Sequence, residues 1–120
     1  MLITWKNSKL SSYLATITNT LTAAVIKYLE FEGHYVTRVQ SQGQYSAKRG
    51  RWIKSTVKRG IGDIIACIDG RLVMIEIKTG KDRQSEWQKQ TEKEVKASGG
   101  CYWIVKEFDD LIKHYKELTA

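Results

Sequence analysis

The chain has 120 residues, of which 42% are apolar and 28% charged, and its net charge is +7. These values exclude a disordered composition and fit one domain, so we expect one globular domain over residues 1–120. No apolar run reaches the roughly 20 residues of a membrane helix and the N-terminus lacks a signal-peptide core, so we expect a cytoplasmic protein without a membrane partner.

The first elements can be read from the spacing of apolar residues. These residues recur at intervals of three and four from Leu10 to Leu29, which predicts one helix or two consecutive helices that end at Gly33. The alternating segment 35–40 then predicts a strand, and 43–53 predicts a loop or a hairpin.

The interval between Glu32 and Asp63 contains no Asp or Glu. A positive field confined to one segment attracts a polyanion, and nucleic acid is the commonest one, although a solvated basic loop has the same composition. We expect DNA as the partner. The candidate nucleic-acid-binding residues are Lys48, Arg49, Arg51, Trp52, Lys54, Lys58 and Arg59. Among them, Trp52 either stacks on a base or fills a contact within the hairpin.

The next two strands, 64–68 and 72–78, form a hairpin that brings charged residues together at its open end. Asp69-Gly70 favours a two-residue type I′ turn, which fixes the register of the strands. Counting back from this turn puts Asp63 directly opposite Glu76, and Lys78 projects from the same face as Glu76. Opposed like charges destabilise a sheet, so this pair of carboxylates requires an explanation.

The C-terminal third completes the predicted fold. A helix over 85–98 precedes a strand over 101–106, and the helical crossover makes this strand parallel to 72–78. A last amphipathic helix begins at Asp109 or Asp110. The order α-β-β-β-α-β-α predicts an α/β fold in which helices cover both faces of a mixed sheet.

Four residues of these elements have a structural interpretation. Cys67 and Cys101 lie in predicted strands, and we expect both to be small buried apolar residues, as in a reducing compartment. We also expect Trp87 and Trp103 to be core aromatics.

Two interpretations of the charged cluster are open. In the first, the strands end there and the charges reach solvent, with Lys78 pairing Glu76. In the second, a divalent cation relieves the carboxylate pair, because hard cations such as Mg²⁺ prefer carboxylate oxygens and usually take one or two from the protein. Asp63 and Glu76 would then be ligands, and the backbone carbonyl of Ile77 could be another. Lys78 could orient or deprotonate a water, or stabilise charge on a phosphate.

Asp63 followed by Glu76-Ile77-Lys78 resembles the D…ExK signature of the PD-(D/E)xK nuclease superfamily. The neighbouring residues are similar to those of VRR-NUC nucleases, and the resemblance covers roughly residues 60–108. The runs that carry it are Gly60-Ile61-Gly62-Asp63-Ile64-Ile65, Glu-Ile-Lys-Thr-Gly at 76–80, and Gln84-Ser85-Glu86-Trp87-Gln88 before a helix that ends in Gly-Gly.

This resemblance implies a restriction-endonuclease-like fold and metal-dependent hydrolysis of DNA, with branched or junction DNA as a possible substrate. It implies Mg²⁺ as the cofactor, with Mn²⁺ as a substitute, and no small-molecule cofactor. By the same similarity Asp63 and Glu76 bind metal, Lys78 is catalytic, and Gln88 helps to order the site. Ser85-x-x-Gln88 is also a capping box, and the two roles of Gln88 are compatible. Compact domains of this type resemble those of bacteriophages, which implies the cytoplasm of a bacterial or phage-infected cell.

The sequence departs from the family pattern in two places. Gly62 precedes Asp63, where the family usually has proline. The family also tends to carry a glutamate on its first helix, whereas residues 16–24 contain no acid, and Glu30 and Glu32 lie near the end of that helix. The first departure is minor, because glycine is sterically permissive, whereas the second places a complete second metal site in doubt.

Two rivals to a nuclease follow from the same residues. One is a DNA-binding module of the same fold without catalysis, and the other is a structural subunit or inhibitor whose basic loop contacts an acidic protein. If the chain does cut both strands of a duplex or a junction, two sites are needed, and we expect a symmetric homodimer.

Overall fold

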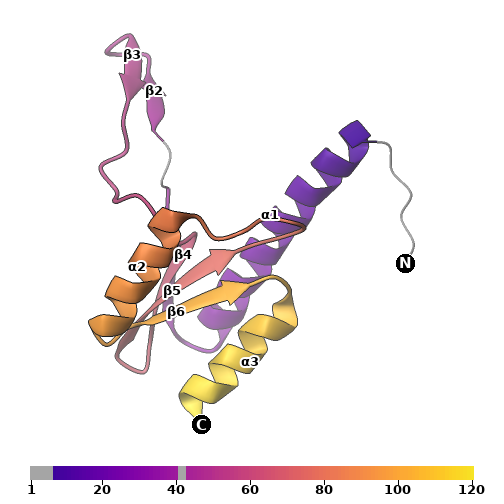
Figure 1. Cartoon of the computed structure of the whole chain (residues 1–120), viewed down its shortest axis with the longest axis vertical. Coiled ribbons are helices and arrows are strands. Elements are labelled where there is room, and N and C mark those ends of the chain that lie inside the picture. The colour runs from indigo at the N-terminus through magenta and orange to yellow at the C-terminus, as the bar shows by residue number, and fades with distance from the viewer. Residues whose placement is uncertain (1–6, 41–42) are drawn as a thin grey trace.

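A computed structural model describes residues 7–40 and 43–120, with the side chains of 7–16 left out of the description. It shows a mixed α/β fold of three helices, a four-stranded sheet and a two-stranded sheet (Figure 1). The elements are α1 (Asn7–Phe31), β1 (Tyr35–Arg38), β2 (Gln44–Ser46), β3 (Arg51–Ile53), β4 (Ile64–Ile68), β5 (Arg71–Ile77), α2 (Glu86–Ala97), β6 (Cys101–Val105) and α3 (Phe108–Thr119). The expected order of the main elements is confirmed, and the first helical segment is one continuous helix.

The four-stranded sheet has the order β1-β4-β5-β6. Neighbouring strands are antiparallel except β5 and β6, which are parallel as expected for strands joined by a helical crossover. Asp69 and Gly70 connect β4 to β5 with φ values of 52° and 79°, the left-handed conformation that a type I′ turn requires at both positions. The predicted register is confirmed, since Ile68 pairs with Arg71 and Cys67 with Leu72.

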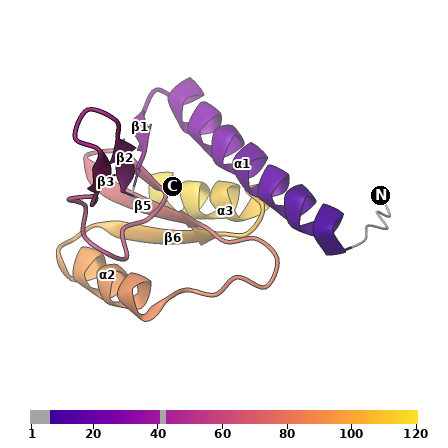
Figure 2. The ribbon, with the colours of Figure 1, turned by 90° about the horizontal axis from the view of Figure 1, so that it is seen from above.

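Helices cover both faces of this sheet, but unequally. α1 and α3 lie on one face and α2 lies on the other, as Figure 2 shows. The core fills the space beneath α1 and α3, and burying each of its larger side chains stabilises the fold by about 1.5–3 kcal/mol. Its fully buried side chains include Val25, Leu29, Ile64, Ile68, Val73, Ile75, Val105 and Leu111.

Two expectations about burial are wrong, and both concern the face of the sheet on which α2 lies. α2 packs over β6 and leaves the β1 and β4 part of this face without a covering helix, so Cys67 is exposed rather than buried. Cys101 is partly buried. Trp87 is not a core residue either: it is 57% exposed, because it lies in the first turn of α2 and turns outward against Arg59. Trp103 is buried, as expected.

β2 and β3 form a separate hairpin that projects from the body of the protein (Figure 1), and we call residues 43–53 the arm. The hairpin alternative for this segment is therefore confirmed. The backbone N–H of Val39, before the arm, donates a 2.8 Å hydrogen bond to the carbonyl of Asp63, after it. The chain thus leaves and re-enters the body at one point. None of the helices in the described part of the chain is long and apolar enough to cross a membrane.

Candidate active site

The charged cluster lies at the open end of the β4–β5 hairpin, opposite its turn. Ile64 pairs with Ile75, so the register places the preceding Asp63 opposite Glu76. The Asp63 carboxylate accepts a 2.7 Å hydrogen bond from the backbone N–H of Ile77, which ties it to β5. Asp63 is therefore held through its side chain by β5 and through its carbonyl by the end of β1.

The absence of a side chain at Gly62 lets the chain pass close to β5 directly before Asp63. A Cβ atom at residue 62 would lie 2.7 Å from Met74 Cγ and 2.8 Å from the Ile75 carbonyl oxygen. Such distances are closer than carbon atoms approach without a shift of the backbone. A residue with a side chain, proline included, does not fit here, so the departure from the family pattern has a local steric cause.

Glu76 is the most constrained member of the cluster. It is only 4% exposed, although it is a carboxylic acid at the end of a strand. Its Oε1 atom accepts a 2.8 Å hydrogen bond from Gln88 Nε2 and lies 3.5 Å from Lys78 Nζ. Its Oε2 atom is buried and has no hydrogen-bond partner among the described residues. One oxygen of the carboxylate is thus satisfied, whereas the other is buried without a partner among the described residues.

The environment of Glu76 disfavours its charged form. Burial, and after it the negative charge of Asp63, raise the pKa of the Glu76 carboxyl to about 7, against the opposing effect of Lys78. Lys78 pairs with Glu76, as the first interpretation of the cluster expected, but its side chain is only 13% exposed. The charges are therefore enclosed rather than released to solvent at the strand ends.

Gln88 connects the cluster to the start of α2. Its backbone N–H donates to the Ser85 hydroxyl at 3.1 Å, and its Oε1 accepts from the Ser85 backbone N–H at 2.8 Å, which completes the predicted capping box. Its Nε2 atom donates to Glu76. The capping role of Gln88 is therefore confirmed, and its hydrogen bond to Glu76 means that the cap of α2 also fixes the position of the Glu76 carboxylate.

Three groups of this cluster could hold a divalent cation. The Lys78 N–H donates to the Val105 carbonyl on β6, so the N–H and carbonyl of Ile77, one residue earlier in the strand, point to the opposite side, toward Asp63. The candidate ligands are therefore the Asp63 carboxylate, Glu76 Oε2 and the Ile77 carbonyl. Among the described residues, no group of three or more His, Cys, Asp or Glu side chains is close enough to bind a metal together.

The first helix brings threonines, not a carboxylate, to the end of β5. Thr18 Oγ1 is hydrogen-bonded to Thr79 Oγ1, next to Lys78 in the chain, and the Thr22 hydroxyl donates to the Thr18 carbonyl at 2.8 Å. The first acidic residue of the whole sequence is Glu30. The departure noted for this helix is therefore real: α1 contacts the region of the site without contributing a negative charge.

Tyr102 is a neighbour of the cluster that the sequence did not reveal. It is buried on the face covered by α2, and its register partner is Met74, two residues before Glu76. Burial, followed by the charge of Glu76, raises the pKa of its hydroxyl to about 12, so the hydroxyl keeps its proton. Only the register of the parallel strands could have indicated this neighbour.

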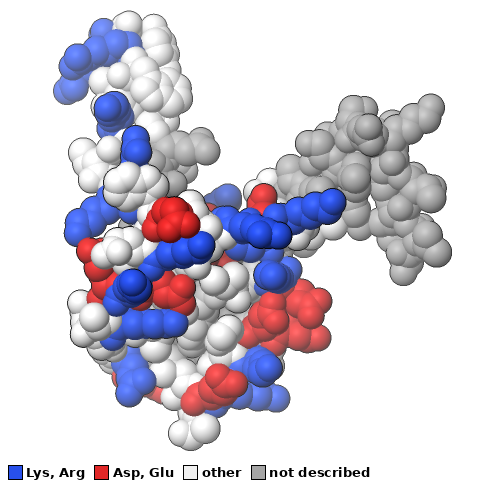
Figure 3. Space-filling view, in the orientation of Figure 1, with Lys and Arg blue, Asp and Glu red and all other residues white. Residues whose placement is uncertain are grey.

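The predicted nucleic-acid-binding residues fall into two groups. Lys58 and Arg59 line a hollow of about 390 Å³ that also contains Gln88, beside the cluster, and the Arg59 guanidinium lies 5.4 Å from the centre of the Trp87 ring. The others are exposed on or beside the arm, away from the cluster, where Figure 3 shows blue side chains. This second group is Lys48, Arg49, Arg51, Trp52 and Lys54.

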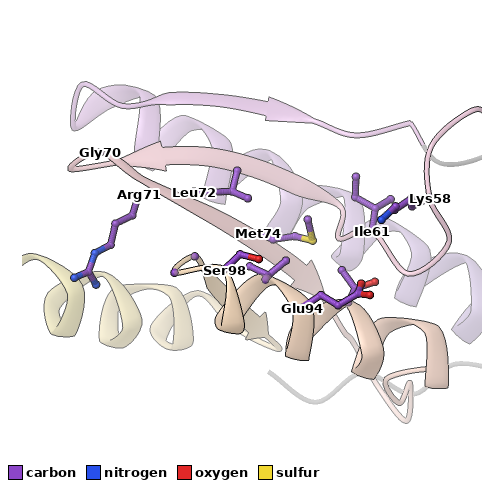
Figure 4. Close-up of a pocket in the computed structure, with 12 residues that line it drawn as sticks. Lys58, Ile61, Gly70, Arg71, Leu72, Met74, Glu94 and Ser98 are labelled. Atoms are coloured by element: carbon purple, nitrogen blue, oxygen red, sulfur yellow. The ribbon is translucent and has the colours of Figure 1, made fainter.

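A second hollow, of about 420 Å³, lies between α2 and the β4–β5 hairpin (Figure 4). Leu72 and Met74 line it from β5, Glu94 and Ser98 line it from α2, and Lys58 lies at its edge. None of the three charged residues of the cluster lines it. The hollow therefore flanks the candidate site and is distinct from it.

Neither a family model nor a curated protein sequence matches the chain. The site is thus defined by its own geometry: a buried carboxylate, Glu76, beside the partly buried Asp63, a lysine in contact with Glu76, and a basic approach. Carboxylates of this kind bind hard cations, and basic surfaces bind polyanions.

Proposed function

We propose that the protein is a metal-dependent nuclease of the PD-(D/E)xK type, similar to VRR-NUC nucleases, with a restriction-endonuclease-like core. It would hydrolyse phosphodiester bonds of DNA. The observation that carries the proposal is Glu76, a buried carboxylate with one unpartnered oxygen beside a second carboxylate and a lysine. This arrangement opposes folding, and a bound cation would offset its energetic cost.

The residues present fit Mg²⁺, and also Mn²⁺, because all three candidate ligand atoms are oxygens. Asp63, Glu76 Oε2 and the Ile77 carbonyl would hold the ion. When bound, it supplies Lewis acidity to the phosphoryl oxygen and lowers the pKa of a coordinated water. Gln88 and Lys78 both face Glu76 Oε1, so they orient the carboxylate and leave Oε2 available.

Lys78 supplies a positive charge at the reacting phosphate. Its ammonium lies 3.5 Å from Glu76 Oε1 in a mostly enclosed position, which restricts the motion of its long side chain. A preorganised cation in a site of low dielectric stabilises negative charge that develops in the transition state. It can also donate hydrogen bonds to an attacking water and orient it.

DNA would reach the cluster over a basic surface. Lys58 and Arg59 line the hollow that contains Gln88, so a phosphate bound there would be adjacent to the carboxylate pair. Contacts to phosphates position a duplex without reading its sequence. We therefore expect little dependence of cleavage on base sequence.

Cleavage assays test this proposal. Purified protein is incubated with plasmid and with four-way-junction DNA in Mg²⁺, in Mn²⁺ and in EDTA, and product is expected with either metal and not in EDTA. Asp63→Asn and Lys78→Ala should each lower the rate by at least about 100-fold. Lys89→Ala is the matched control, because Lys89 is exposed on α2 and its one ion pair among the described residues is with Glu86, at 3.2 Å. Cleavage by Lys78→Ala at the wild-type rate, or no product from any substrate, would contradict the proposal.

A DNA-binding module without catalysis is the second candidate. It is favoured by one observation: α1 contributes Thr18, and no acid, near the end of β5. Such a protein would bind DNA with an affinity that falls steeply with salt, with a slope near −0.9 for each phosphate neutralised, and would form no product in any metal.

We also propose that the protein acts as a homodimer, since cutting both strands requires two sites. The part of the sheet face without a covering helix exposes Tyr35, Cys67 and Leu72, which could contact a second copy. Sedimentation velocity at micromolar concentration should show a dimer, and Leu72→Glu should shift it toward monomer. A wild-type monomer with and without DNA would contradict this.

A further inference from the structure

The arm carries two large aromatic side chains that the cluster does not use. Tyr45 and Trp52 are directly paired across β2 and β3, so they lie on the same face of the hairpin. Each is 63% exposed, and neither is stacked on another ring among the described residues. A two-stranded hairpin on its own is marginally stable in water, so a surface of this kind is suited to covering by a partner.

Trp52 is held in place by the backbone beside it. A Cβ atom at Gly43 would lie 2.5 Å from Trp52 Nε1, so the indole edge rests against the glycine and the remainder of the ring stays exposed. Tyr45 lines a hollow of about 490 Å³ at the root of the arm, together with Lys54. The two rings are thus presented beside a recess and a positive charge.

The charges around the rings indicate the class of partner. The arm has only positive charges, because no Asp or Glu occurs between Glu32 and Asp63, and its basic side chains are exposed. Aromatic faces within a cationic surface bind nucleic acid through base stacking and phosphate contacts together. An acidic protein would match the charges through its carboxylates alone, whereas nucleic acid carries a planar base with each phosphate and so matches both the charges and the rings.

The position of the arm relates these rings to the cluster. The hydrogen bond between Val39 and Asp63 closes the root of the arm at one of the two candidate metal-binding carboxylates. Nucleic acid bound along the arm would therefore continue to the cluster, whose Asp63 directly precedes β4. Bases in a continuous duplex are stacked on each other and do not offer their faces, whereas bases at a branch or in a single strand do.

We propose that the arm binds unpaired bases of DNA by stacking them on Tyr45 and Trp52, and so directs the protein to branched or partly single-stranded DNA. The link to cleavage rests on the proposed nuclease function, whereas the binding step is independent of it. Gly43 is a positioning residue for the indole, because its missing side chain leaves the space that the ring edge occupies.

Binding in EDTA tests this inference without catalysis. The probes are a Y-branched DNA with 2-aminopurine at the unpaired positions next to the branch, and a duplex of equal length. We expect the wild type to prefer the branched probe and to quench its fluorescence. Stacking of one base corresponds to roughly 5- to 150-fold in affinity, so Tyr45→Val with Trp52→Val should weaken branch binding by at least about tenfold. Valine keeps the preference of both positions for a strand.

Three further variants separate stacking from charge and from general damage. Phe31→Ala removes an exposed aromatic outside the arm and should leave both affinities unchanged. Lys48→Ala with Arg49→Ala should weaken branch and duplex binding by the same factor, because these side chains meet phosphates. Gly43→Ala should move the hairpin backbone as well as the indole, because its Cβ atom would lie 2.5 Å from both Trp52 Nε1 and the Ile53 carbonyl oxygen. It should lower the preference for the branch, with duplex binding unchanged.

Each outcome is decisive. Equal affinity of the wild type for branch and duplex, an unchanged branch preference in the valine variant, or no DNA binding at low salt would overturn the inference. If no metal supports cleavage but the valine variant loses its branch preference, the nuclease proposal fails and the role of the arm stands. If cleavage occurs and the preference is unchanged, the reverse holds.

Discussion

Glu76→Gln should gain stability relative to the wild type as the pH rises through neutrality, although it alters a residue at the centre of the candidate site. The pKa of this carboxyl is raised from 4.5 to about 7 in the folded state, chiefly by burial and then by Asp63. Its protonated form therefore favours folding below pH 4.5, and this contribution is lost as the pH rises through 7. At about 1.4 kcal/mol for each pH unit between these two values, the loss is about 3 kcal/mol.

Glutamine has no charge to bury, so the variant should lack this pH dependence. Its amide nitrogen would take the place of the unpartnered Oε2 atom, at a cost of about 1–3 kcal/mol that is the same at every pH. The difference between variant and wild type should therefore move by about 3 kcal/mol in favour of the variant from pH 4.5 to pH 8. Only this change in the difference between variant and wild type isolates the effect of the Glu76 carboxylate on stability.

Urea denaturation in EDTA, followed by tryptophan fluorescence, to which the buried Trp103 contributes, measures the free energy of unfolding at both pH values. Glu92→Gln is a control of opposite sign, because the hydrogen bond from Lys96 lowers the pKa of Glu92. That variant should be relatively less stable at pH 8 than at low pH. If the difference in free energy of unfolding between Glu76→Gln and the wild type is equal at both pH values, this prediction is refuted. Glu76 would then not be a buried carboxylate that becomes charged without a metal.

Three other outcomes are expected. Millimolar Mg²⁺ should raise the melting temperature of the wild type more at pH 8 than at pH 5 and leave that of Glu76→Gln unchanged; equal shifts in scanning fluorimetry would argue against ligation by Glu76. Gly70→Ala should lower the free energy of unfolding by about 1 kcal/mol, because its φ of 79° is unfavourable for alanine, and an unchanged urea midpoint would contradict this. Lys48→Ala with Arg49→Ala should reduce the slope of log affinity against log salt by about 2, and a slope equal to that of wild type would exclude phosphate contacts by this pair.

The local part of the site could be predicted because a two-residue turn determines it. Asp69 and Gly70 adopt the positive φ values expected of their sequence, and the register that follows places Asp63 opposite Glu76. The capping box of α2 could be predicted for a similar reason, because it joins Ser85 and Gln88 within one helical turn. The hydrogen bond from Gln88 to Glu76 joins residues on different elements, so only the family resemblance suggested it.

Exposure was harder to predict than secondary structure. Alternation along a strand tells which residues share a face, but not whether a helix covers that face. Cys67 is exposed and Tyr102 is buried on the same face, because α2 packs over β6 and not over β4. The positive charge of the arm could be predicted from the sequence, whereas its projection away from the body could not.

The insertion between Val39 and Asp63 starts and finishes at neighbouring backbone atoms. β1 and β4 are already adjacent and antiparallel, with Arg38 opposite Ile64, so a tight turn could join them and leave the four-stranded sheet intact. Since closing a longer or shorter loop changes the free energy only slightly, evolution or a protein engineer could exchange this segment as a cassette. New targets could then be acquired while the carboxylate pair stays as it is.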